Sequence, residues 1–236
     1  MDISEKEFEL KIEEHEDTKG YKQLDKSVTE VCIPENYEFI AEGAFVDCKN
    51  LKSITIPENI SKICKFAFLR CNNLETVILP DNGLEIESAA FLECTKLENI
   101  DIPDSIIKIG TSVFTNTEWW KSQPEGILYM SKIACDYKGN MQQHMNITIR
   151  DGTRAIAKCT LINSSIEPDK IESFVVTIPE SVVYIGEDQF RIGSIPFTDE
   201  DQSKNEDFRK KALIRCYENS YGHEYAKENK INFEFI

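Results

Sequence analysis

The chain has 236 residues, of which 41% are hydrophobic and 29% charged, so it can bury a core and remain soluble. Its 42 acidic residues outnumber 27 basic ones, and the formal net charge of −15 disfavours nucleic acids and anionic membranes as partners. No stretch reaches the ~18 apolar residues that a membrane-spanning helix needs, so membrane insertion is not expected. The acidic surface is compatible with a basic protein partner and equally with plain solubility.

Residues 1–27 are a polar lead-in, in which Phe8, Leu10 and Ile12 alternate as they would in a strand. We expect this segment to cap the repeats that follow, because an end turn would otherwise expose an apolar edge. The segment lacks the basic and apolar regions of a signal peptide. We therefore expect a cytoplasmic protein if Met1 is the native start, and otherwise an exported or cell-surface protein.

Residues 28–116 contain four copies of one 23-residue pattern. Each copy closes a short apolar phrase with a proline, at Pro34, Pro57, Pro80 and Pro103. An aliphatic residue follows six positions later, and a phenylalanine follows after eleven, at Phe45, Phe68, Phe91 and Phe114. A fixed period of 20–29 residues is typical of a leucine-rich solenoid, whose turns must stack to bury their apolar faces.

Each copy predicts the same succession of elements. In LKSITIP, a strand at residues 51–56 turns Ile54 and Ile56 to one face, and the proline ends it. In KFAFLRC, residues 65–71, a short helical turn would place Phe68 and Cys71 on one side. We therefore expect a strand, a corner and a helical segment in every turn.

A column of cysteines follows the same register, at Cys48, Cys71 and Cys94, with Thr117 in the fourth turn. Adjacent turns would lie ~4.8 Å apart, which a disulfide can span, but buried cysteine also acts as a small hydrophobic residue. We favour packing. The remaining cysteines form no CxxC pair, and none of the three histidines lies close to two cysteines, so neither a metal site nor a cofactor is expected.

Residues 117–146 break the period. Two apolar runs separated by only two residues predict a hairpin over residues 127–137. Just before it, Trp119 and Trp120 either cover the repeats where the period breaks or offer aromatic anchors to a partner.

Residues 147–197 resume the pattern imperfectly. Arg150 replaces the proline, Leu161 the phenylalanine and Ser164 the cysteine, and a later turn recovers the motif at Pro179. Residues 198–236 then read as a polar loop and a C-terminal cap, with a strand in ALIRCY, a helix capped near Ser220 and a last strand in INFEFI.

The spacing of IP, I, AF and C resembles that of the BspA-like leucine-rich repeat family. WWKSQPEGILYMSKIACDYKGNMQQHMNITIRDGTRAIA resembles the hairpin-bearing interruption of these proteins, and CYENSYGHEYAKENKINFEF their terminal segment. The resemblance covers residues 28–236. It implies a right-handed repeat solenoid with a parallel β-sheet face, short helical turns opposite, a β-hairpin interruption and a C-terminal α/β cap. Members of this family are mostly binding or surface proteins.

No constellation of catalytic residues is apparent, so an enzyme is not expected. Outward positions of the predicted strands form short polar columns, and these with the tryptophans are our candidate partner-binding residues: Ser53, Thr55, Thr76, Asn99, Asp101, Trp119 and Trp120. Small side chains let a protein, or a glycan, approach the strands closely, but they also simply suit an exposed strand face. A non-enzymatic recognition scaffold and a structural or adhesive surface module without a defined ligand therefore both remain open, as does the oligomeric state.

Overall fold

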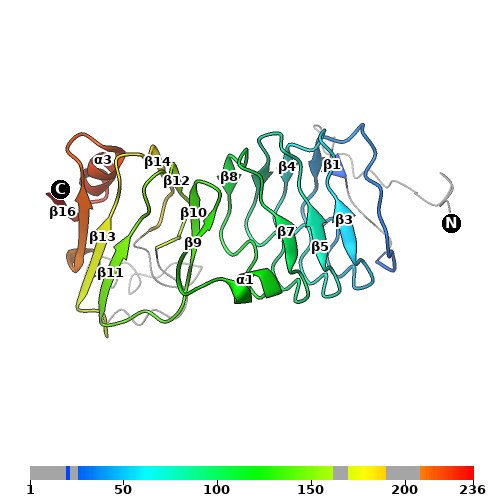
Figure 1. Cartoon of the computed structure of the whole chain (residues 1–236), viewed down its shortest axis with the longest axis horizontal. Helices are drawn as coiled ribbons and strands as arrows, with labels where there is room; N and C mark the ends of the chain where they lie inside the picture. Colours follow the sequence, from blue (N-terminus) through cyan, green and yellow to red (C-terminus); the bar gives the residue numbers. More distant parts are fainter. Residues whose placement is uncertain (1–19, 22–25, 162–169, 190–207) are drawn as a thin grey trace, which may run out of the picture. The chain divides into compact units, whose positions relative to one another are not determined.

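The computed structural model describes residues 20–21, 26–161, 170–189 and 208–236 (Figure 1). The chain divides into two compact units. We call residues 1–108 with 112–122 the repeat unit, and residues 109–111 with 123–236 the C-terminal unit. The strand expected at Phe8–Ile12 lies outside the described residues, as does Ser164.

In the repeat unit, the predicted strands pair in parallel with a constant register (Figure 1). They form the sheet β3–β5–β7, with bounds Ser53–Thr55, Thr76–Ile78 and Asn99–Asp101. Ile54 and Val77 are buried beneath it at 3% and 1% exposure. The alternation of apolar and polar residues therefore sets the inward and outward faces as expected.

A second parallel sheet, which the sequence reading took for a corner, runs through the same turns. Its order is β1–β2–β4–β6–β8, with bounds Gly20–Tyr21, Phe39–Ile40, Lys62–Ile63, Glu85–Ile86 and Lys108–Ile109. Each strand has only two residues, and the aliphatic residue six positions after each proline points inward. A full turn of the repeat thus contributes to two sheets.

The prediction of a helical turn in residues 65–71 is wrong. Phe66 and Arg70 have positive φ angles, 57° and 59°, which a right-handed helix cannot accommodate. The segment forms successive tight turns, and the Phe68 N–H donates to the Ala90 carbonyl of the next repeat at 2.7 Å. The N–H groups of Phe66, Phe68 and Arg70 thus link adjacent repeats, where a helix would use them internally, while those of the residues between them bond within the turn.

The phenylalanines form a continuous stack inside the turns. Ring centroids of Phe45, Phe68, Phe91 and Phe114 follow one another at 4.7, 4.9 and 5.2 Å, with planes within 5° of parallel. The cysteine column beside them is buried, and Cys48, Cys71 and Cys94 form no disulfide. The Cys71 thiol donates to the Phe45 carbonyl oxygen at 3.0 Å, so the column packs and bonds to the backbone without a disulfide.

After the last regular turn, helix α1 (Glu118–Ser122) leads to the predicted hairpin. Strands β9 (Gly126–Met130) and β10 (Ile133–Lys138) pair antiparallel, which confirms this prediction. In the C-terminal unit β10 also pairs in parallel with β12 (Ala155–Ile156), and β12 with β14 (Tyr184–Ile185).

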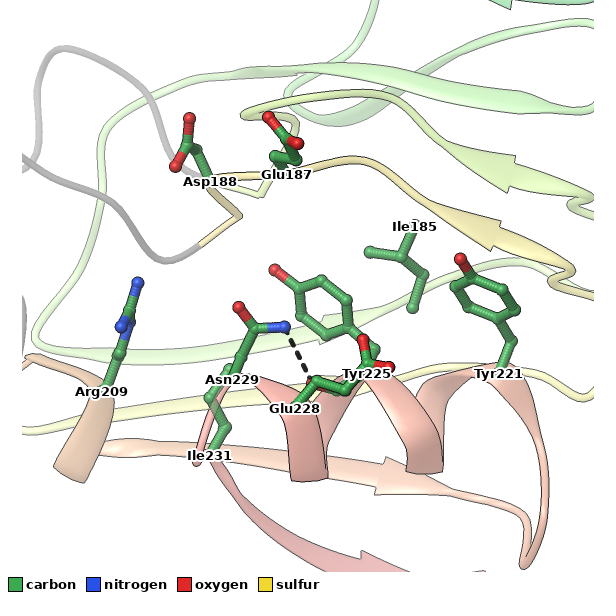
Figure 2. Close-up of a pocket in the computed structure, with 9 residues that line it drawn as sticks. All are labelled: Ile185, Glu187, Asp188, Arg209, Tyr221, Tyr225, Glu228, Asn229 and Ile231. Carbon is green, nitrogen blue, oxygen red and sulfur yellow. Dashed lines mark hydrogen bonds between the residues drawn. The ribbon is translucent and has the colours of Figure 1, made fainter.

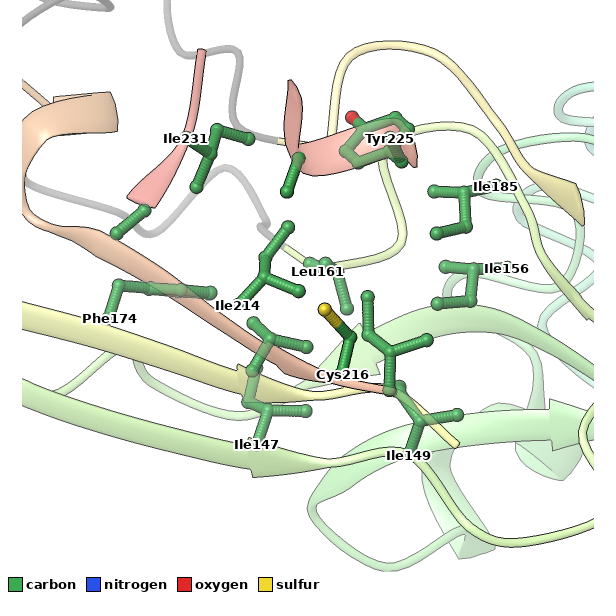
Figure 3. Close-up of a cluster of buried hydrophobic side chains, with 14 of the residues drawn as sticks. Ile147, Ile149, Ile156, Leu161, Phe174, Ile185, Ile214, Cys216, Tyr225 and Ile231 are labelled. Atoms are coloured by element: carbon green, nitrogen blue, oxygen red, sulfur yellow. The ribbon is translucent and has the colours of Figure 1, made fainter. Parts of the chain in front are cut away.

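The other sheet of the C-terminal unit is fully parallel. Its order is β11–β13–β15–β16, with bounds His144–Thr148, Ser173–Thr177, Ala212–Cys216 and Asn232–Phe235. Figure 3 shows its inward residues, among them Ile147 and Ile214, in a core that Leu161 joins at 1% exposure. Helix α3 (Tyr221–Glu228) begins at Ser220, whose side chain accepts the His223 N–H at 3.3 Å. None of the described helices has the length and apolar character to cross a membrane.

Candidate functional site: an acidic groove on the strand face

The outward side chains of strands β3, β5 and β7 form two columns, as the sequence predicts. The register places Ser53 beside Thr76 and Thr76 beside Asn99. The second column runs from Thr55 through Ile78 to Asp101. Thr76 is half-buried and the others are exposed, so both columns face solvent.

Part of this face is hollowed into a groove of about 760 Å³ over β5 and β7. Its lining includes three of the predicted candidates together with three residues that the sequence reading did not select: Thr76, Asn99 and Asp101, and Ile78, Asp81 and Glu98. Ser53 and Thr55 lie on the adjacent strand β3 and do not line the groove. The structure therefore brings together the candidates of the third and fourth turns.

Ile78 is the apolar centre of the groove. Its side chain is 54% exposed, whereas the residues that flank it in the strand, Val77 and Leu79, are buried. Because it points outward from a parallel strand, it adds nothing to the core of the repeats. The sequence did contain a signal, since an isoleucine interrupts an outward column otherwise made of Thr55 and Asp101.

The groove is acidic and its carboxylates lack basic partners. Among the described residues, Asp81, Glu98 and Asp101 form no ion pair, and Glu98 accepts only a long hydrogen bond from the Asn99 amide at 3.4 Å. These three side chains therefore leave a negative potential over the groove.

Some carboxylates elsewhere in the same unit are paired between turns. The Asp47 carboxylate accepts two hydrogen bonds from Arg70, at 3.0 and 2.8 Å, and this contact lowers the pKa of Asp47. Glu87 pairs with Lys62 at 2.7 Å; burial opposes its ionisation, but the hydrogen bond from Lys62 prevails and the pKa of Glu87 is lowered. The acidic side chains of the groove have no such pairs among the described residues.

The backbone beneath the groove is fixed by bonds between turns. The Thr76 N–H donates to the Lys52 carbonyl at 3.3 Å and the Asn99 N–H to the Glu75 carbonyl at 3.1 Å. On the other side of the strand, the Ile56 N–H donates to the Ile78 carbonyl at 2.9 Å. Because these bonds are already formed, binding at the groove needs no ordering of its strands.

The two tryptophans lie on α1 and do not line the groove. The backbone N–H of Trp119 donates to the Leu97 carbonyl at 2.8 Å. The Trp119 ring packs against Phe114 at a centroid distance of 5.2 Å. The Trp120 N–H donates at 3.0 Å to Thr117 Oγ1, so the threonine in the fourth cysteine position caps this helix. Trp119 thus covers the end of the phenylalanine stack, and partner binding by either tryptophan stays a prediction.

The described residues offer little for catalysis or metal binding. Nowhere in the described part of the chain do three histidine, cysteine or acidic side chains come together as a metal site. His223 is buried beside Phe233 and accepts the Asn219 N–H, while Ser220 caps α3. This pair therefore has a structural role.

Residues 19–123 match the family described as the BspA type leucine-rich repeat region (6 copies). The repeats of this segment are BspA-type leucine-rich repeats. Their parallel strands, phenylalanine stack and cysteine column are the structural counterpart of the 23-residue pattern. No curated protein matches the chain.

Solved bacterial leucine-rich repeat proteins are similar to the chain at low identity. A protein of Bacteroides ovatus ATCC 8483 is 17% identical, with 84% of this chain and 55% of that one covered and a TM-score of 0.37. A leucine-rich repeat protein of T. pallidum is also 17% identical, with 82% and 90% covered and a TM-score of 0.41. The chain thus spans about half the length of the Bacteroides ovatus protein.

Proposed function

We propose that the repeat unit is a non-enzymatic recognition scaffold whose acidic groove binds an extended, basic segment of a partner protein. The observation that carries this proposal is the exposed Ile78 between the unpaired carboxylates of Asp81 and Asp101. A partner residue with an aliphatic side chain would cover Ile78, and lysine or arginine on either side of it would meet the carboxylates.

The two kinds of contact have different roles. Burial of apolar surface on Ile78 would contribute about 25 cal/mol per Å² and lengthen the lifetime of the complex. The carboxylates would mainly accelerate association and select for positively charged partners. Salt would weaken this electrostatic attraction. A glycan fits this groove less well than a peptide, because neutral sugars gain nothing from unpaired carboxylates beyond hydrogen bonds.

Leucine-rich repeats generally serve as non-enzymatic scaffolds for protein interaction. BspA-like proteins are often found at bacterial surfaces, and we extend that location to this chain as part of the proposal. A structural or adhesive module without a defined ligand is the competing function, and the following experiment separates the two.

A displayed library of random peptides is panned against three forms of the protein. The first is the wild type, and the second carries Ile78→Arg and Asn99→Arg, which add bulk and positive charge to outward positions of the groove. The third carries Ile107→Arg, because Ile107 is a 63% exposed isoleucine of the same unit that does not line the groove. Circular dichroism verifies that all three are folded.

We expect the wild type and the Ile107→Arg control to enrich peptides in which lysine or arginine flanks an aliphatic residue. The groove variant should enrich none of these. Enrichment of the same peptides by all three forms would contradict the groove as the binding site. No enrichment by any form would favour the structural module.

A further inference from the structure

The C-terminal unit contains a separate polar pocket of about 290 Å³ between the end of β14 and helix α3. Figure 2 shows Glu187 and Asp188 on one side of it, and Arg209, Asn229 and two tyrosines, Tyr221 and Tyr225, on the other. None of these residues belongs to the acidic groove. The volume lies at the lower end of the ~300–1,000 Å³ typical of small-molecule sites, which suits a ligand of one ring.

Arg209 provides a hydrogen-bond donor that lacks an acceptor. Its Nε atom is shielded from solvent and has no hydrogen-bond partner among the residues that the structure describes. A buried donor left unpaired is costly, and in folded proteins the great majority are satisfied. The guanidinium of Arg209 also lines the pocket, where its other N–H groups can donate to a ligand oxygen.

The opposite wall provides acceptors whose charge is partly balanced. Lys158 pairs with Asp188 at 3.0 Å and with Glu187 at 3.4 Å. The hydrogen bond with Asp188, reinforced by Glu187, raises the pKa of Lys158, so its ammonium group stays positive at neutral pH. The carboxylate oxygens of Glu187 and Asp188 face Arg209 across the pocket. They can accept hydrogen bonds from a ligand, and their pairing with Lys158 reduces the repulsion between the two carboxylates.

The tyrosines add an aromatic surface and a further donor. Tyr221 is 41% exposed at the rim, and its ring centroid lies 6.4 Å from that of Tyr184, which is 53% exposed. Tyr225 lies deeper, and burial raises its pKa to about 12, so its hydroxyl remains protonated at neutral pH. In Figure 2 this hydroxyl points into the space between Arg209 and Glu187.

We propose that this pocket binds a neutral saccharide. Each sugar hydroxyl both donates and accepts, so neighbouring hydroxyls can accept from Arg209 while they donate to Asp188 or Glu187. The C–H face of a sugar ring is apolar and would pack on the exposed ring of Tyr221. An anion would meet three carboxylates, including that of Glu228. A cation would meet Arg209, and two of the carboxylates are already paired with Lys158. A neutral polyhydroxylated ring avoids both conflicts.

The test uses the full chain and a panel of D-glucose, D-galactose, D-mannose, N-acetyl-D-glucosamine and lactose, with acetate and inorganic phosphate as charged probes. Saturation-transfer-difference NMR detects binding, and titration of any ligand found gives its Kd. The variants are Tyr221→Ala and Arg209→Gln. Tyr217→Ala is the matched control, because Tyr217 is also 41% exposed but does not line the pocket.

We expect at least one neutral sugar to bind, with a Kd raised about tenfold or more by Tyr221→Ala and by Arg209→Gln, and unchanged by Tyr217→Ala. The proposal is overturned if no neutral sugar binds, or if only acetate or phosphate does. It is also overturned if the Kd is the same in every folded variant. Thermal unfolding of each variant distinguishes loss of the site from loss of the fold.

Discussion

Trp119 lies against Phe114 with a ring-centroid distance of 5.2 Å and a tilt of 56°, whereas each phenylalanine stacks within 5° of parallel on the one before it. The next repeat would have supplied another phenylalanine at this end of the stack. The tilted indole takes its place and covers the ring of Phe114, which is buried at 2% exposure. The change from stacking to a tilted contact therefore marks the position where the 23-residue period ends.

Replacing this indole should destabilise the repeat unit. Because Trp119 is half-buried, we expect Trp119→Ala to lower the free energy of unfolding by about 2–4 kcal/mol, at or below the range for fully buried aromatics. Lys121→Ala, an exposed change on the same helix, should cost less than about 0.5 kcal/mol. Urea denaturation measures both, and equal losses would mean that Trp119 does not cover the stack.

The middle of the stack should be still more sensitive. Phe68 is fully buried between Phe45 and Phe91, so Phe68→Ala leaves a cavity and should cost roughly 3–5 kcal/mol. The outward Lys52→Ala should cost less than about 0.5 kcal/mol. Similar values for the two variants would show that the inward and outward faces are assigned wrongly.

The tight turns predict opposite effects for two serine-to-glycine changes. Ser112 is exposed and has φ of 55°, a left-handed conformation that glycine adopts without the cost of a Cβ, so Ser112→Gly should raise stability by about 0.5–1 kcal/mol. Ser53 is exposed in strand β3, where Ser53→Gly should lower stability by a similar amount. Changes of the same sign in thermal or urea unfolding would contradict this account of the turns.

The thiols should differ in reactivity and pH dependence. Burial, with a contribution from the Glu87 carboxylate, raises the pKa of Cys64 from 9.0 to about 11. Alkylation of Cys64 in the folded protein should therefore accelerate up to about pH 11, whereas the exposed Cys32 marks the reactivity of an open thiol. Buried Cys71, whose pKa is raised by its contact with Cys94 and by burial, should react only on unfolding.

The same shift has a consequence for stability. The folded state holds the Cys64 proton more tightly than the unfolded state, so its contribution is complete below about pH 9 and is lost as the pH rises toward about 11. Glu87→Gln should move the alkylation profile of Cys64 to lower pH, and Glu75→Gln should not. Mass spectrometry of each cysteine peptide checks this, and identical profiles for the two variants would contradict the cause assigned to the shift.

The parts of the fold that could be predicted are those that recur at the same position in every copy of the repeat. Phe68, Cys71 and Ile54 recur at fixed positions, so their burial follows from stacking equivalent turns. The second sheet could not be predicted in the same way, because a two-residue strand such as Lys62–Ile63 has no alternation to read. The positive φ angles of Phe66 and Arg70 could not be predicted from the sequence either, since neither residue type favours that conformation.

The candidate site was predicted only in part, for a related reason. Thr76, Asn99 and Asp101 follow from the strand period, which fixes the outward face. Asp81 and Glu98 lie just outside the strands, and their approach to the same groove depends on the stacking of neighbouring turns. The tyrosine and arginine pocket joins residues from well-separated segments, and no local pattern relates Arg209 to Asp188.

The measurement that tests the central proposal most directly is the affinity of a selected basic peptide as a function of salt concentration. Isothermal titration would compare the wild type with a variant that carries Asp81→Lys and Asp101→Lys, two changes at groove positions outside the hydrophobic core. We expect the wild type to bind more weakly as salt rises, and the variant to lose at least about tenfold in affinity at low salt. The salt dependence of the variant should be weaker or reversed. Equal affinity and equal salt dependence for the two proteins would contradict the acidic groove as the binding site.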